Sequence, residues 1–311
     1  MPFHWAGERL MKYTDIMSMV GQTPHLRVRS AETPAARIHV KLEGYNPTGS
    51  VKDRACLNMI RTLEREGQLR PPVTLLDASS GNMACAIALF AKLYGFPATV
   101  IVNSKITADK RNFLQYFGAE VIQVGDFTIE GNRYCREVLL QREPGKYLFL
   151  DQLHNWSNPQ AYYESIGPEI LADFPDVAMV VGSLGSGGTM NGTGRFLKEK
   201  KRGIKIVAVE AARGTKLPGT GSFDDGDYVT PFIQSARDEG VFDHMVKVTE
   251  QDAVRRTAQL REQGIFCGLQ TGGVLHAAIT AINKFKIEGD VVIVSGDTGW
   301  KNMEKLLHMR I

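Results

Sequence analysis

Short apolar segments alternate with longer helix-like segments along most of the chain, and this alternation constrains the fold more than any other feature. Runs of strand length occupy 38–42, 73–77, 98–102, 121–124, 147–150, 178–181, 204–209, 245–248 and 291–294. Helix-like segments between them occupy 82–94, 107–117, 128–141, 159–172, 188–200, 251–263 and 273–285. Short apolar strands separated by helices are typical of parallel sheets covered on both faces. We therefore predict an α/β protein.

Length and composition indicate a globular protein. The 311 residues suffice for one large core or two modest ones, and we predict two α/β domains with a cleft between them. The net charge of +3 is too small to indicate a nucleic-acid or anionic-membrane partner. No apolar run approaches the length of a bilayer span, and the first residues lack the apolar core of a signal peptide. We expect a soluble, cytoplasmic protein.

Cysteine and histidine spacing indicates neither disulfides nor a metal centre. The four cysteines lie far apart, without a Cys-x-x-Cys pair, and three of them fall in apolar helix-like runs. This pattern is typical of buried thiols in a reducing compartment. The seven histidines show no metal-ligand spacing, so we predict no metal site.

The segment Lys41–Arg54 joins a strand to a helix through an Asn-Pro-Thr-Gly turn. Ser50 is expected to cap this helix, and Asp53 to complete the cap three residues later. Lys52 stands in the first helical turn, where the helix dipole opposes its charge and lowers its pKa. A neutral lysine amine can attack an aldehyde and form a Schiff base. Taken alone, however, a lysine at such a place is usually a solvated surface residue.

Two further loops follow strands and open helices. They are 79–84 (Ser-Ser-Gly-Asn-Met-Ala) and 185–189 (Gly-Ser-Gly-Gly-Thr). Unpaired backbone N–H groups at a helix start attract a carboxylate or a phosphate. The second loop is neither a dinucleotide fingerprint, because residue 190 is Met, nor a Walker A loop, because no Lys follows it. Either loop by itself could also be an ordinary strand-to-helix turn.

Together these motifs resemble those of the cysteine synthase and cystathionine β-synthase family. The run Asn46-Pro-Thr-Gly-Ser-Val-Lys52-Asp-Arg54 is similar to the pyridoxal-phosphate lysine motif of that family. Loop 185–189 resembles its phosphate-binding Gly-Thr-Gly-Gly-Thr, and loop 79–84 resembles its Thr-Ser-Gly-Asn-Thr-Gly. Residues 268–272 (Gly-Leu-Gln-Thr-Gly) resemble its Gly-Ile-Ser-(Ser/Thr)-Gly. The motifs stand in family order between residues 21 and 301.

The resemblance implies the fold and the cofactor. The fold would be that of the type II pyridoxal-phosphate enzymes, similar to the tryptophan synthase β chain, with two doubly wound domains and mostly parallel sheets. Residues 37–147 would form a smaller, mobile domain, and residues 1–36 together with 148–311 a larger one. The cofactor would be pyridoxal 5'-phosphate, and the family is usually homodimeric.

The resemblance also implies roles for individual residues. Lys52 would form the Schiff base and act as the catalytic base. The cofactor would be held by Lys52, Asn82, Gly185, Ser186, Gly187, Gly188, Thr189 and Gln270. The substrate carboxylate would be held near Ser79, Ser80, Gly81, Met83 and Gln152.

Departures from the family pattern concern the substrate and the cofactor ring. Met83 replaces a threonine that donates to the carboxylate, which adds apolar bulk there. Gln270 stands where the family has a serine facing the pyridine nitrogen, so either its amide or the Thr271 hydroxyl would take that place. A neutral group there leaves the ring unprotonated, which favours β-elimination over deeper carbanion chemistry.

Several short stretches between residues 252 and 301 are similar to one bacterial branch of the family. That branch makes cysteine from O-phosphoserine and a thiocarboxylated sulfur-carrier protein, so such a carrier is an implied partner. Gly221 stands where the branch has a phosphate-binding arginine, although Arg213 and Lys216 are nearby in sequence.

We predict a pyridoxal-phosphate-dependent β-replacement on an O-activated L-serine, either O-acetyl- or O-phosphoserine. The reaction would pass through an aminoacrylate, and a sulfur nucleophile would give L-cysteine or a related β-substituted alanine. Two alternatives remain open. The same site could carry out β-elimination, as a serine or threonine dehydratase does, or the chain could be a non-catalytic binding or regulatory protein with this fold.

Overall fold

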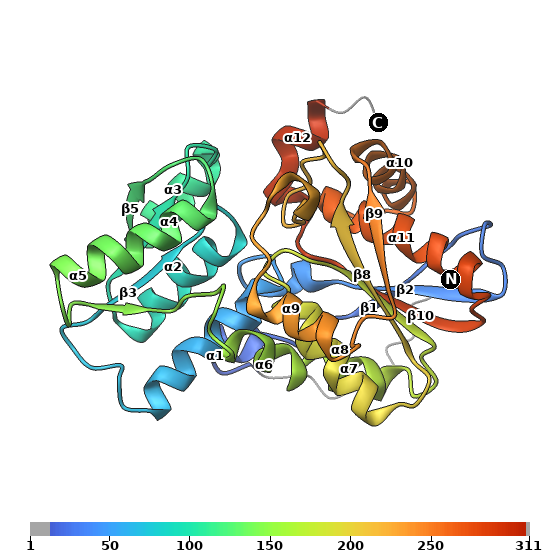
Figure 1. Cartoon of the computed structure of the whole chain (residues 1–311), viewed down its shortest axis with the longest axis horizontal. Helices are drawn as coiled ribbons and strands as arrows, with labels where there is room; N and C mark the ends of the chain where they lie inside the picture. Colours follow the sequence, from blue (N-terminus) through green and yellow to red (C-terminus); the bar gives the residue numbers. More distant parts are fainter. Residues whose placement is uncertain (1–12, 309–311) are drawn as a thin grey trace, which may run out of the picture.

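The computed structural model describes residues 13–308 and has two sheets, each in its own lobe (Figure 1). The larger sheet has the strand order β1-β2-β10-β7-β8-β9, and only β1 runs antiparallel to its neighbour. Its strands are β1 (His25–Val28), β2 (Ala36–Lys41), β7 (Met179–Ser183), β8 (Lys205–Ala211), β9 (His244–Val248) and β10 (Gly289–Val294). The predictions made for residues 1–12 lie outside the described residues.

The smaller sheet is entirely parallel. Its strand order is β5-β4-β3-β6, with β3 (Thr74–Ala78), β4 (Ala98–Val102), β5 (Glu120–Gln123) and β6 (Tyr147–Phe149). Every residue of β3 and β4 is buried, as expected for inner strands covered on both faces. The predicted α/β class with mostly parallel sheets is confirmed.

Helices cover both sheets, and α1 (Lys52–Arg65) lies where the two lobes meet (Figure 1). It packs against α2 (Asn82–Tyr94) of the smaller lobe and α6 (Ser157–Tyr163) of the larger lobe. The other helices are α3 (Ala108–Tyr116), α4 (Thr128–Tyr134), α5 (Leu140–Arg142), α7 (Ile166–Asp173), α8 (Gly188–Lys200), α9 (Pro231–Asp238), α10 (Glu250–Arg261), α11 (Leu269–Phe285) and α12 (Met303–His308). A π-helical turn, η3 (Cys135–Leu139), joins α4 to α5, and 3₁₀ turns occupy η1 (Met17–Met19), η2 (Glu43–Tyr45), η4 (Phe223–Asp225) and η5 (Gly299–Asn302).

The predicted start of the smaller domain at residue 37 is wrong for one strand. Residues 36–41 form β2, which is hydrogen-bonded between β1 and β10 in the larger sheet. Local sequence cannot assign a strand to a sheet, because β2 and β10 come from opposite ends of the chain. The remaining boundaries and the mobility of the smaller domain stay predictions.

Two helix predictions also differ from the structure. The segment 159–172 is divided into α6 and α7 at Glu164–Ser165. Pro168 explains the break, because its ring lacks an N–H and would clash with the carbonyl of Glu164 in a continuous helix. Within the stretch 211–240, predicted to be irregular, Pro231–Asp238 forms α9, which begins with Thr230 as its N-cap and proline in its first turn.

The sheets place the ends of several buried strands toward one region. In open parallel sheets, ligands bind beyond the carboxyl ends of the strands. Here β3, β7 and β10 end at Ala78, Ser183 and Val294, close to the motifs singled out in the sequence. All four cysteines are buried free thiols, as predicted. Among residues 13–308, no helix has the length and apolar character needed to cross a bilayer.

Candidate active site

The glycine loop (residues 185–189) connects β7 to α8 and lines a pocket at the carboxyl end of the larger sheet. Gly187 has φ of 82°, a left-handed conformation that favours glycine. A Cβ there would lie closer than 3.0 Å to Ile233 Cγ1, and one on Gly185 would approach the Gly219 carbonyl oxygen to 2.8 Å. The loop is thus a close-packed backbone turn at a helix N-terminus, which is suited to a phosphate.

Lys52 faces this loop. Its Nζ donates a hydrogen bond to Ser186 Oγ at 3.2 Å, although the two residues come from distant parts of the chain. Burial lowers the pKa of Lys52 to about 8, while the Asp77 carboxylate acts in the opposite direction. The sequence predicted this direction from the helix dipole, but the largest cause in the structure is burial. A partly neutral amine therefore lies next to a phosphate-type site.

The predicted cap at the start of α1 is wrong in detail. The N-cap residue is Val51, whose side chain makes no capping hydrogen bond, although Ser50 Oγ accepts the Lys52 N–H at 3.4 Å. Asp53 instead turns back to the preceding loop, where its carboxylate accepts the backbone N–H of Thr48 at 2.6 Å and also the Thr48 hydroxyl. Burial raises the pKa of Asp53 to about 6. Asp53 therefore bonds to the Asn-Pro-Thr-Gly turn that precedes α1, because Thr48 in this turn is buried and its N–H needs a partner.

Gln270 lines the same pocket, at the start of α11. Its Nε2 donates to the Gly219 carbonyl oxygen at 2.9 Å and to the Ser183 hydroxyl. A Cβ on Gly296 would collide with Gln270 Oε1, so this glycine leaves the room that the amide occupies. Thr271, the predicted alternative, is fully buried and does not line the pocket. Of the two, Gln270 is the residue at the pocket wall.

Asn82 reaches the larger lobe through Asp297. Its Nδ2 donates to Asp297 Oδ2 at 2.9 Å, and Asp297 follows Gly296, which lines the pocket. Asp297 is buried, which raises its pKa. This bond joins the first residue of α2 to the segment after β10.

The residues predicted to bind the substrate carboxylate gather at the carboxyl end of β3. Gln152 Nε2 donates to the Ala78 carbonyl oxygen at 3.0 Å. Ser79 Oγ accepts the Gly81 N–H at 3.2 Å, and Ser80 Oγ accepts the Asn103 N–H at 2.6 Å. Their contact with a substrate stays a prediction. The same holds for Met83, whose side chain is buried among the apolar residues around α2.

Several residues at the site were missed by the sequence analysis, among them Ser183, Gly219 and Asp77. Ser183 and Gly219 line the pocket beside Gln270. Asp77 is fully buried at the end of β3, where it accepts the N–H groups of Ala78 at 2.7 Å and Gln152 at 3.2 Å. Burial raises the pKa of Asp77 to about 8. Asp77 could have been noticed in the sequence, because it is a charged residue near the end of a mostly apolar strand. Nothing in the sequence around Ser183 or Gly219 indicated a place in the site.

Comparison with known proteins gives the family. The sequence model described as "Pyridoxal-phosphate dependent enzyme" matches residues 16–296. The chain belongs to this family. It is 37% identical over 272 residues to cysteine synthase B of Pseudomonas aeruginosa, covering 86% of this chain and 89% of that one. It is 31% identical over 280 residues to cysteine synthase B of Escherichia coli, covering 89% of each.

A solved structure has the same fold. The chain superimposes with a TM-score of 0.89 on O-acetylserine sulfhydrylase isoform 3 of Entamoeba histolytica, at 27% identity, covering 100% of this chain and 96% of that one. The predicted cofactor is confirmed with the family: the protein depends on pyridoxal phosphate. The predicted resemblance to the cysteine synthases is likewise confirmed.

The residues present fit this cofactor. Lys52 supplies an amine of lowered pKa whose hydrogen-bond partner is a hydroxyl, not a carboxylate. The glycine loop supplies the N–H groups at the start of α8 for a phosphate. Gln270 supplies a neutral amide on the pocket wall. Lys52 would therefore hold the aldehyde carbon, the glycine loop the phosphate, and Gln270 would lie near the ring.

Proposed function

We propose that the protein replaces the β-substituent of an O-activated L-serine with a sulfur nucleophile, giving L-cysteine or a related β-substituted alanine. The observation that carries this proposal is the pocket that contains both the Lys52 amine and the neutral Gln270 amide. Among the described residues that line this pocket there is no carboxylate. A neutral neighbour does not stabilise the protonated form of the cofactor ring, and an unprotonated ring favours loss of a β-substituent.

Lys52 has two tasks in this reaction. When bound, pyridoxal phosphate withdraws electrons from the substrate α-carbon and so acidifies its proton. Lys52 Nζ is the base placed to take that proton, because its lowered pKa leaves part of it neutral near neutral pH. The same Nζ can return the proton after the nucleophile has added. The glycine loop fixes the phosphate meanwhile, so that the reacting carbon stays near Lys52.

The substrate carboxylate is proposed to lie at the N-terminus of α2. The turn Ser79–Gly81 precedes this helix, whose free N–H groups and positive dipole end attract a carboxylate. Gln152 is held at the same strand end through its bond to the Ala78 carbonyl. Binding there would draw the smaller lobe over the site and exclude water.

The leaving group, the sulfur donor and the assembly are further proposals. O-acetylserine and O-phosphoserine both fit the reaction class, and a sulfur-carrier protein is a proposed partner. We also propose a cytoplasmic homodimer, as the sequence resemblance implies.

The test offers O-acetyl-L-serine, O-phospho-L-serine and L-serine to the purified holoenzyme, each with and without sulfide. We expect cysteine from at least one O-activated serine, and only when sulfide is present. Release of pyruvate at the same rate without sulfide would instead favour the dehydratase alternative. A visible spectrum that none of the three amino acids changes would favour the non-catalytic alternative.

A further inference from the structure

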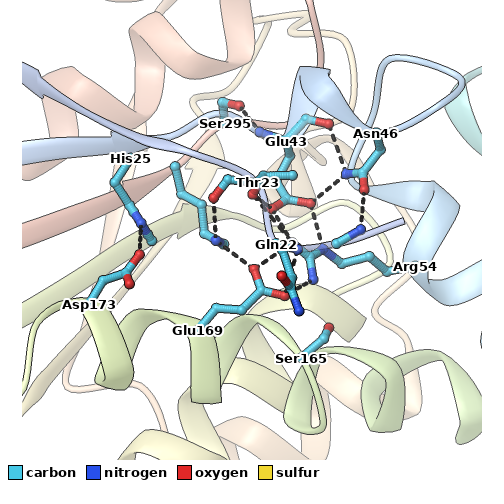
Figure 2. Close-up of polar contacts among 12 residues, drawn as sticks. Gln22, Thr23, His25, Glu43, Asn46, Arg54, Ser165, Glu169, Asp173 and Ser295 are labelled. Carbon is cyan, nitrogen blue, oxygen red and sulfur yellow. Dashed lines mark hydrogen bonds and ion pairs between the residues drawn. The ribbon is translucent and has the colours of Figure 1, made fainter. Parts of the chain in front are cut away.

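A buried charge cluster lies behind the first turn of α1 (Figure 2). It consists of the side chains of Lys41, Glu43, Arg54 and Glu169. The side chains of Lys41, Glu43 and Arg54 are at most 2% exposed, and that of Glu169 is 18% exposed. Two cations face two carboxylates, so the cluster has no net charge. The proposed reaction uses none of these groups.

Arg54 is the member that joins the others. Its Nε and Nη2 donate to the two carboxylate oxygens of Glu43 at 2.7 and 2.8 Å. Its Nη1 and Nη2 donate to those of Glu169 at 2.6 and 2.9 Å. One planar guanidinium is thus held by two carboxylates from different elements. A lysine carries its donors on a single nitrogen and cannot reproduce both paired contacts.

The cluster fixes the chain segments that lead into α1. Glu43 also accepts hydrogen bonds from the Thr23 hydroxyl at 2.6 Å and from Asn46 Nδ2 at 2.8 Å (Figure 2). Lys41, at the end of β2, pairs with Glu169 of α7 at 2.6 Å. The cluster therefore joins four segments at one buried point: the end of β2, the Asn-Pro-Thr-Gly turn, α1 and α7.

Arg54 follows Lys52 by two positions, so the two side chains leave the helix about 200° apart. Lys52 faces the glycine loop, while Arg54 faces the carboxylates of Glu43 and Glu169. A helix held on one side cannot rotate about its axis without breaking those contacts. Fixing Arg54 therefore fixes the direction in which Lys52 leaves the helix.

We propose that Arg54 is a positioning residue, which holds the first turn of α1 through Glu43 and Glu169 so that the Lys52 amine points at the glycine loop. This inference rests on the proposed function, in which Lys52 carries the cofactor. It separates two contributions to cofactor binding. The glycine loop holds the phosphate whatever the state of Arg54, whereas the link to Lys52 requires the cluster.

The experiment compares two ligands on cofactor-free protein. Pyridoxal phosphate can join Lys52, while pyridoxine phosphate has the same ring and phosphate with an alcohol in place of the aldehyde. In Arg54→Lys we expect the affinity for pyridoxal phosphate to fall by about tenfold or more relative to that for pyridoxine phosphate. Affinity for pyridoxine phosphate itself should stay within about twofold of wild type. Loss of structure alone would weaken both ligands together.

A matched control is available on β2. Arg37 makes the same kind of paired contact with Asp290, at 2.8 and 2.7 Å, but its side chain is half exposed. Arg37→Lys should leave the ratio of the two affinities unchanged. Glu169→Gln leaves the Arg54–Glu43 pair in place, so it should lower the ratio of the affinity for pyridoxal phosphate to that for pyridoxine phosphate less than Arg54→Lys does. If Arg54→Lys does not fold, Glu169→Gln still tests the inference.

A second measurement does not involve the cofactor. The pH dependence of labelling of Lys52 by an amine reagent reports the pKa of the free amine. We expect about 8 for the wild type and a rise toward the ordinary lysine value in Arg54→Lys, because a displaced amine reaches water. A wild-type affinity ratio and labelling profile in both variants would overturn the inference. Equal wild-type affinity for the two ligands would refute the lysine link itself, and with it the proposed function.

Discussion

Gly187→Ala tests whether the backbone of the glycine loop forms the phosphate site. The substitution has two costs in this structure. Gly187 has φ of 82°, and an L-residue in that region costs about 1–2 kcal/mol. Its new Cβ would also lie closer than 3.0 Å to Cγ1 of Ile233, which is fully buried and cannot turn away.

The second cost can be isolated with a matched glycine. Gly203 has φ of 84°, but nothing lies within 4 Å of a Cβ built there. Gly203→Ala therefore has the conformational cost without the collision. Overpacking of a core costs about 1–3 kcal/mol, so Gly187→Ala should be less stable than Gly203→Ala by about that amount. The collision is relieved by moving the loop, which displaces the N–H groups of 187–189.

Thermal unfolding and titration with pyridoxal phosphate measure the two consequences. We expect Gly203→Ala to lose stability but bind the cofactor as the wild type does. Gly187→Ala should bind at least about tenfold more weakly, because a loss of about 1.4 kcal/mol in binding is tenfold in affinity. Equal cofactor affinity in the two variants would show that the loop backbone does not hold the phosphate.

The remaining predictions concern single side chains. Lys52→Ala should abolish both turnover and the visible absorbance of the lysine-linked cofactor; full activity would contradict the proposed mechanism. The pKa of Lys52 is about 8, and only the neutral amine attacks an aldehyde. The initial rate of cofactor attachment to cofactor-free protein should therefore rise from about pH 6 to about pH 9 and then level off. A rate that does not change with pH would exclude this amine as the attacking group. Gln270→Glu should lower stability by about 1–3 kcal/mol, measured by chemical denaturation, since a carboxylate would face the Gly219 carbonyl oxygen in place of a donor. Arg54→Met should lower the free energy of unfolding by about 3–5 kcal/mol in the same assay, because it leaves the Glu43 carboxylate buried without its cation. A smaller loss than in Arg37→Met would show that the buried charge cluster does not stabilise the fold.

Helices and strands whose sequence signal is local could be predicted with their boundaries. The helix at 82–94, the strand at 98–102 and the helix at 188–200 begin and end in the structure where they were predicted. Burial of both sheet faces makes each strand a continuous apolar run, and glycine or proline marks the turns between them. The break between α6 and α7 had such a signal in Pro168, which the helical pattern around it concealed.

The candidate site was predictable where a motif is continuous in sequence. Lys52 and the glycine loop were found as separate motifs, and in the fold Lys52 Nζ lies 3.2 Å from Ser186 Oγ of that loop. Asp77 and Ser183 could not be placed, because their roles depend on neighbours from other strands. The partner of Asp53 was predicted wrongly for the same reason: a local capping rule competes with a buried N–H that only the folded turn presents.

By itself, the sequence determined the α/β class and the individual motifs, because each depends on residues that are near one another along the chain, and the resemblance of those motifs to one family implied the cofactor. Tertiary structure alone decided that β2 joins the larger sheet, that Gln270 and not Thr271 lines the pocket, and that Arg54 is held by Glu43 and Glu169. These outcomes depend on burial and on contacts between distant segments. A pattern along the chain records which residues are apolar or charged, but not which of them become neighbours when the chain folds.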